Sequence, residues 1–113
     1  MATEITIRPA TGTWVIRAAG AVIGESVNAL ELTEGDYPPV IYFPRGDIAM
    51  AFLDQSDLTS SCPLKGAATY FTIIAKSGPI KNAGWSYETP NDAASGIKDH
   101  IAFRHDKVAV EQV

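Results

Sequence analysis

Short segments rich in β-branched and aromatic residues recur along the whole chain, and turn-forming residues separate them. In the first third, the segments are EITIRP (residues 4–9), TWVIRA (13–18), AVIGE (21–25) and ALELTE (29–34). An Ala-Gly pair between the second and third segments predicts a hairpin. This spacing favours a mainly β fold built from antiparallel strands.

The middle of the chain continues the pattern. Residues 40–43 follow two prolines, which preset an extended backbone, and end at Pro44, which has no N–H for a strand ladder. The stretch AATYFTIIAKSG (67–78) has the best strand composition in the chain, and because both faces of its middle are largely apolar we expect a central strand. The segment IKNAGWSYE (80–88) is interpreted either as another strand or as an extended crossing segment.

The remaining segments predict short helical turns, a loop and a second hairpin. Asp47 is expected to cap a helical turn over residues 48–53, and a proline before Asn91 and Asp92 predicts another over 92–97. The polar stretch LDQSDLTSSCP (53–63) is interpreted as a surface loop.

The C-terminal segment predicts two paired strands, 101–104 and 108–110, joined by a turn at His105 and Asp106. The expected fold is therefore mainly β, with two antiparallel sheets in an open sandwich or barrel and one or two short helical turns.

Length and composition limit the class of protein. A chain of 113 residues is expected to form one domain, residues 1–113, which buries a core without disulfides or a metal. The formal net charge of −4 argues against nucleic-acid binding, which needs a surplus of lysine and arginine. No signal peptide and no membrane-spanning stretch are recognised, and the single cysteine does not indicate an oxidising compartment, so we expect a cytoplasmic protein without membrane contact.

Cys62 and Lys65 are the candidate catalytic residues. They flank a turn that begins with Pro63, and a nearby ammonium lowers the pKa of a thiol by favouring the thiolate. The alternative is that Cys62 is a small apolar group packed in the core. Gly66 follows directly and permits a positive φ at the exit of the turn.

Arg45 and a group of aromatic residues are the candidate ligand-binding residues. A guanidinium after a strand end is suited to a carboxylate or phosphate, or to an ion pair with Asp47 or Asp57. Trp85 and Tyr87 lie on one side of an extended segment, because side chains alternate along a strand. With Tyr42 and Tyr70 they are expected either to wall a pocket or to fill the core.

No metal site and no cofactor are predicted. One cysteine and two histidines do not supply the four ligands of a structural zinc, and no glycine-rich phosphate loop occurs.

Four ordered segments, YPPVIYFPRGDI, CPLKGAATYF, AGWSYETP and IAFRHDKVAVE, resemble the domain of unknown function 427 family of small bacterial and fungal proteins. The resemblance covers roughly residues 14–110. It implies a β-tent architecture, in which two antiparallel sheets are pinned near one end and splayed at the other. Relatives with that fold often hold zinc through four cysteines, which this chain lacks.

Three hypotheses follow for the function. The first is that the domain binds a small polar or anionic molecule in a pocket between sheets, through Tyr42, Arg45, Cys62, Lys65, Trp85 and Tyr87. The second is a small transferase or hydrolase-like enzyme that uses Cys62 or Lys65. The third is an interaction module, in which an exposed edge strand such as residues 4–8 pairs with a partner or with a second copy in a homodimer.

Overall fold

A computed structural model describes residues 4–113; residues 1–3 of the expected domain lie outside the described part. The described strands are β1 (Ile5–Pro9), β2 (Trp14–Ala18), β3 (Ala21–Ser26), β4 (Leu30–Glu34), β5 (Val40–Tyr42), β6 (Leu53–Cys62), β7 (Gly66–Ala75), β8 (Gly78–Ser86), β9 (Ile101–Phe103) and β10 (Ala109–Gln112). Three short 3₁₀ helices accompany them: η1 (Arg45–Asp47), η2 (Met50–Phe52) and η3 (Asp92–Ile97). The prediction of a mainly β fold with short helical turns is confirmed.

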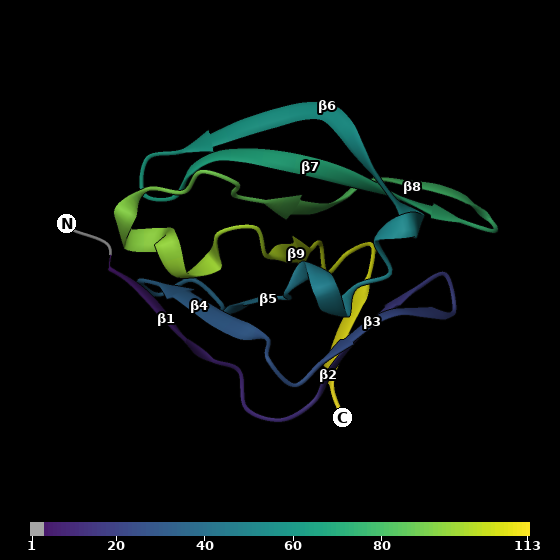
Figure 1. Ribbon diagram of the computed structural model, residues 1–113, viewed down its shortest axis with the longest axis horizontal. Helices are drawn as coiled ribbons and strands as arrows, with labels where there is room; N and C mark the ends of the chain where they lie inside the picture. Colours follow the sequence, from purple (N-terminus) through teal and green to yellow (C-terminus); the bar gives the residue numbers. More distant parts are fainter. Residues whose placement is uncertain (1–3) are drawn as a thin grey trace.

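Within residues 4–113 the strands form three antiparallel sheets and no closed barrel. Their orders are β1-β4-β5, β10-β2-β3 and β6-β7-β8-β9. The long β6–β7–β8 ribbons lie along one side of the molecule, and the two three-stranded sheets lie beneath their two ends (Figure 1). The predicted open antiparallel architecture is therefore present, but its described strands form three sheets where two were expected.

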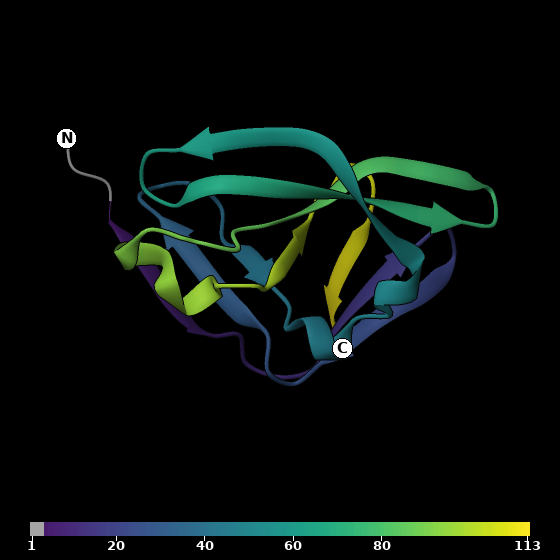
Figure 2. The same cartoon turned by 45° about the horizontal axis from the view of Figure 1, so that its top comes forward.

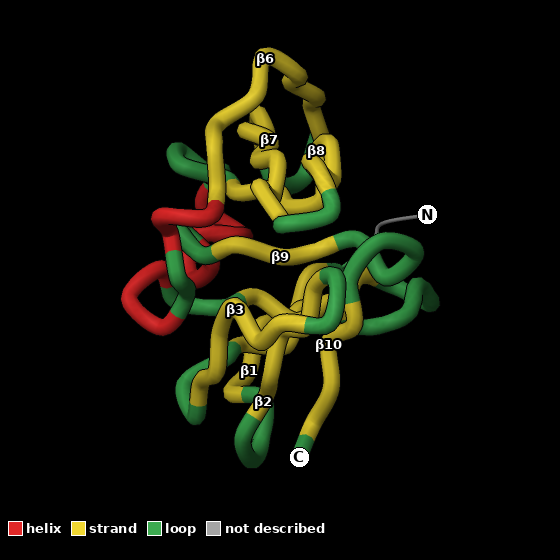
Figure 3. Tube along the Cα trace, turned by 90° about the vertical axis from the view of Figure 1, so that its right-hand side faces the viewer, coloured by secondary structure: helices red, strands yellow, loops and turns green. Residues whose placement is uncertain are grey.

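Strands β5 and β9 join the sheets in the middle of the molecule. Phe43, directly after β5, forms a bridge with Ile101 of β9, with backbone hydrogen bonds of 2.8 and 2.9 Å. The side view shows β9 between the β6–β8 ribbons and the strands β2, β3 and β10 (Figure 3). The turned view shows β5 and β9 approaching each other at the centre (Figure 2). The bridge thus ties the four-stranded sheet to the β1-β4-β5 sheet.

The predicted hairpin of β2 and β3 is confirmed. Ala19 and Gly20 form its two-residue turn with φ values of 49° and 83°. Positive φ at both central positions matches the right-handed twist of the strands, which is why such turns are favoured in hairpins.

The interpretation of residues 53–63 as a loop is wrong, because residues Leu53–Cys62 form β6. This strand is polar because it is an edge strand with most of its side chains exposed. Its pairing with β7 supplies the backbone hydrogen bonds, and this tertiary contact overrides the weak strand propensity of serine and aspartate. The prediction of a central strand within residues 67–78 is confirmed, since β7 lies between β6 and β8 and ends at Ala75.

The predicted C-terminal hairpin is also wrong. The two strands are present, but β9 pairs with β8 and β10 pairs with β2. All three residues of β9 are buried, so this strand needs neighbours on both faces, whereas β10 is largely exposed at a sheet edge. The segment IKNAGWSYE, for which two interpretations were open, contributes to strand β8.

One of the two predicted helical turns is confirmed, and the other differs from the structure. The turn over Asp92–Ile97 is confirmed as η3. The turn expected over residues 48–53 is instead divided into η1 and η2, and Asp47 caps neither of them. Its carboxylate accepts a hydrogen bond of 2.6 Å from the Ser26 hydroxyl, so the side chain joins η1 to the end of β3.

Two clusters of buried apolar side chains stabilise the described part of the domain. The first cluster is aliphatic and phenylalanine-rich and lies between all three sheets; it includes Ile16, Ile41, Phe43, Phe71, Ile73, Ile101 and Phe103. The second cluster lies between the β1-β4-β5 sheet, η3 and the four-stranded sheet; its members are Leu32, Tyr42, Ala68, Tyr87, Ala94, Ile97 and Ala102. Alternate residues of β5 and β9 belong to different clusters, as expected for strands buried on both faces.

Across residues 4–113, none of the helices is both long enough and apolar enough to cross a membrane.

Candidate functional site

A groove of about 580 Å³ opens beside the second cluster, between the β1-β4-β5 sheet and the four-stranded sheet. Its volume lies within the roughly 300–1,000 Å³ typical of small-molecule sites. The aromatic rings of its lining are Tyr37, Tyr42, Tyr70, Trp85, Tyr87 and His105. The other lining residues are Leu32, Glu34, Pro38, Pro39, Val40 and Lys65. The groove is therefore rich in aromatic surface, and its lining also contains one carboxylate, Glu34, and one ammonium, Lys65.

The strand period explains why these residues meet. Side chains two apart share one face of a strand, and Leu32 and Glu34 line the groove from β4, as Val40 and Tyr42 do from β5. Tyr70 of β7 is the register partner of Trp85 of β8, so these two rings lie side by side on one face of the four-stranded sheet.

The Tyr42–Trp85 pair joins the two sheets at the groove. The Trp85 indole N–H donates a hydrogen bond of 3.2 Å to the Tyr42 hydroxyl, and the rings meet edge to face with centroids 6.4 Å apart. Tyr42 is 1% exposed, and its burial is the main cause that raises the pKa of its phenol. Tyr42 therefore stays protonated and serves as a fixed partner for Trp85.

Lys65 and Glu34 form an ion pair in the groove wall. The Lys65 ammonium donates a hydrogen bond of 2.5 Å to a Glu34 carboxylate oxygen, and the side chains are only 14% and 20% exposed. The ammonium also lies 5.9 Å from the centroid of the Tyr87 ring. Burial alone would lower the pKa of Lys65, but the Glu34 hydrogen bond and nearby anionic groups outweigh it, and the pKa is raised. The Tyr87 pKa is also raised, chiefly by burial and despite the opposing charge of Lys65.

The turn that carries Lys65 is held from the other side by Asn91. The Asn91 side chain donates to the Pro63 carbonyl at 3.0 Å, and its backbone N–H donates to the Lys65 carbonyl at 3.0 Å. Gly66 ends the turn with a φ of 108°, as the sequence predicted for this glycine. Hydrogen bonds within the protein therefore hold the backbone at Lys65 in place without a ligand.

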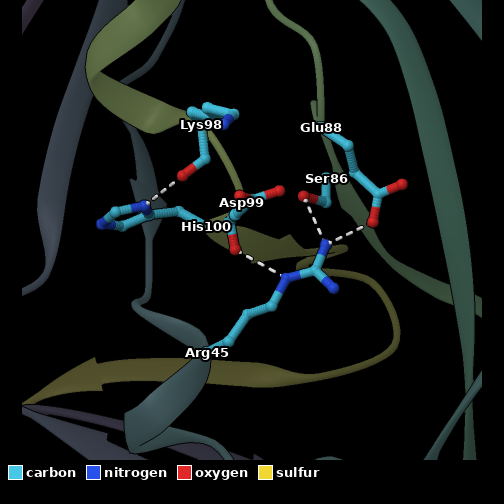
Figure 4. Close-up of polar contacts among 6 residues, drawn as sticks. All are labelled: Arg45, Ser86, Glu88, Lys98, Asp99 and His100. Carbon is cyan, nitrogen blue, oxygen red and sulfur yellow. Dashed lines mark hydrogen bonds and ion pairs between the residues drawn. The ribbon is translucent and has the colours of Figure 1, made fainter.

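Arg45 contacts Ser86 and Glu88 (Figure 4), which alternate with Trp85 and Tyr87 along the chain. Its Nη2 atom donates to the Ser86 hydroxyl at 3.0 Å and to Glu88 at 2.8 Å, and its Nε atom donates to the Asp99 carbonyl at 2.7 Å. Its guanidinium carbon also lies 5.3 Å from the centroid of the Phe71 ring. The expected partners of Arg45, Asp47 and Asp57, are replaced by Glu88, because strand pairing brings Glu88 close.

Of the six predicted ligand-binding residues, the structure brings four together. Tyr42, Lys65, Trp85 and Tyr87 line the groove, and Arg45 and Cys62 are not among its described lining residues. Cys62 ends β6, pairs in register with Gly66 and packs against the second cluster while remaining partly exposed. Cys62 therefore lies at the margin of the second cluster, and its role stays a prediction.

Sequence reasoning missed several lining residues. Glu34 shares its strand face with Leu30 and Leu32, so the alternation in ALELTE contained a signal for it. No comparable local signal existed for Tyr37 or His105. They belong to loops far apart in sequence, and only the fold brings them to the same groove.

Residues 6–113 match the family model described as "Domain of unknown function (DUF427)". The match covers nearly the whole chain, and this chain therefore belongs to the DUF427 family, as its sequence motifs predicted. No curated protein matches the chain significantly.

Proposed function

We propose that this domain binds a small polar molecule in the groove between its sheets. The observation that carries the proposal is the combination of aromatic walls with the Lys65–Glu34 pair in a hollow of about 580 Å³. Small-molecule sites typically combine apolar walls, which supply contact area, with a few polar groups that orient the ligand. The fixed Tyr42–Trp85 hydrogen bond and the Asn91-held turn support a site that is formed before the ligand arrives.

Within this proposal, Tyr42, Lys65, Trp85 and Tyr87 belong to the ligand site. Arg45 is proposed to position the site without lining it, because its hydrogen bonds to Ser86 and Glu88 hold the segment that carries Trp85 and Tyr87. The binding proposal is favoured over an enzyme that uses Lys65 as a base. The raised pKa of Lys65 keeps its ammonium protonated at neutral pH, where it donates hydrogen bonds and does not abstract a proton.

Trp85 provides the experiment. The chain has two tryptophans, so the Trp14→Phe variant leaves Trp85 as the single fluorescent reporter in the groove. A metabolite library is screened by thermal shift, and each compound that raises the melting temperature is titrated against this variant. We expect a saturable change in Trp85 emission. A screen without any stabilising compound, or with stabilising compounds that leave Trp85 unchanged, would contradict the proposal.

A further inference from the structure

The charges of the groove lining are balanced before a ligand binds. Lys65 and Glu34 contribute one charge of each sign and are bonded to each other at 2.5 Å. Among the described lining residues, His105 is the only other ionisable side chain besides the tyrosines. A ligand anion would have to compete with Glu34 for the ammonium, leaving the mostly buried carboxylate without its partner. This balance disfavours a phosphate or a carboxylate as the main recognised group.

The polar groups of the groove suit ligand groups that both donate and accept hydrogen bonds. Lys65 offers only donors, and Glu34, when ionised, offers only acceptors. A hydroxyl interacts with either of them, and two adjacent hydroxyls interact with both without adding charge to the site. Such bonds to ionised groups are stronger than those between neutral groups. The pair therefore matches a vicinal diol.

The aromatic surface of the groove suits a ring with an apolar face. Tyr70 and Trp85 are register partners on neighbouring strands, so their side chains lie on the same face of the sheet, and both line the groove. Tyr37, which is 71% exposed, and the prolines Pro38 and Pro39 line the groove from the loop before β5. A flat ring with C–H groups on its face is buried well between such walls.

From these three features we infer that the ligand of the groove is an uncharged carbohydrate, whose ring packs on Tyr70 and Trp85 and whose hydroxyls bond Lys65 and Glu34. This inference rests on the proposed function, since it names the class of molecule for the same groove.

The test compares three sets of probes on the folded domain. Neutral sugars are glucose, galactose, N-acetylglucosamine, maltose and cellobiose; anions are phosphate and citrate; nucleosides are adenosine and uridine. Binding is detected by saturation-transfer NMR and quantified by Trp85 emission in the Trp14→Phe variant. We expect at least one sugar to bind, with an affinity that changes little with ionic strength, because the ligand carries no charge to screen.

Variants locate the bound sugar. Glu34→Gln and Lys65→Met are each expected to weaken binding about tenfold or more. Because either change removes half of a mostly buried pair and affects folding, Tyr37→Ala serves as a second variant at an exposed lining residue and is also expected to weaken binding. Glu111→Gln, at an exposed ion pair outside the groove lining, is the matched control and is expected to bind like the wild type.

The outcomes separate the two proposals. Binding of the anions or the nucleosides in the groove, with no sugar bound, would overturn the carbohydrate inference and leave the proposed function intact. Sugar binding that none of the groove variants weakens would also overturn it. If no compound of the wider metabolite screen binds, the proposed function itself fails.

Discussion

The first hydrophobic cluster contains only aliphatic and phenylalanine side chains among its buried members, whereas the second contains Tyr42 and Tyr87 and adjoins the Lys65–Glu34 pair. Strands β5 and β9 contribute to both clusters through alternate residues. The two faces of β5 therefore serve different purposes. Ile41 packs in the apolar first cluster, whereas Tyr42 presents its hydroxyl at the groove, where Glu34 of β4 and Lys65 of the β6–β7 turn form the charged pair.

Phe43 and Tyr42 allow the largest test of this contrast, since they are neighbours in sequence and belong to different clusters. Phe43 is fully buried, and Phe43→Ala is expected to lower the free energy of unfolding by about 3–5 kcal/mol, because it leaves a cavity in a closely packed core. Urea denaturation measures the change. A loss below about 1 kcal/mol would show that the first cluster is not the main source of stability.

Arg45→Ala is expected to have the next largest effect, lowering the free energy of unfolding by about 2–3 kcal/mol. The substitution removes three hydrogen bonds and leaves the Ser86 hydroxyl, which is 0% exposed, without its arginine donor. The control is Arg17→Ala, which breaks an exposed pair with Glu111 and is expected to cost less than about 1 kcal/mol. Equal losses of unfolding free energy in the two variants would mean that Arg45 does not stabilise the segment that carries Ser86 and Glu88.

Tyr42→Phe tests the polar side of the second cluster with a smaller expected effect. Loss of the hydroxyl leaves the Trp85 indole N–H without its acceptor, which is expected to cost about 1–2 kcal/mol. The emission of Trp85 in the Trp14→Phe background is expected to shift at the same time. Tyr70→Phe, whose hydroxyl bonds the exposed Ser60, is the matched control and should lower stability less. An unchanged Trp85 spectrum in Tyr42→Phe would contradict the role given to this hydrogen bond.

The smallest and most selective expected effect is the pH dependence of the contribution that Lys65 makes to stability. Because its pKa is raised in the folded state, its contribution to stability is fully present below the unfolded value of about 10.4 and is lost as the pH rises through the folded value. The stability advantage of the wild type over Lys65→Met should therefore be constant near neutral pH and decline above about pH 10.

Lys81→Met, at an exposed position, is the control for that titration. It retains the buried tyrosines, whose raised pKa values also reduce stability at alkaline pH, so only the difference between the two variants reports Lys65. Parallel alkaline losses in the two variants would show that the Lys65–Glu34 pair does not contribute as described.

The sequence was most informative where local patterns decide the structure. Alternation and turn residues located the β2–β3 hairpin and η3, and the strand-like composition of residues 67–78 located the central strand β7. Local patterns did not predict strand β6 or the placement of β9 and β10 in different sheets. Both features depend on which other strand of the fold pairs with the segment. The same limit applies to the site. The pairing of β7 with β8 brings Tyr70 next to Trp85, and Arg45 forms its ion pair with Glu88 rather than with an aspartate that is closer in sequence.

The bridge between Phe43 and Ile101 has a consequence for folding. Because β5 and β9 are embedded in both clusters, neither cluster can lose its order without removing residues from the other. Unfolding is therefore expected to be a single cooperative transition, and amide hydrogens around the groove should exchange through the same global opening as those of the apolar interior. The groove walls are thereby expected to be as rigid as the apolar interior.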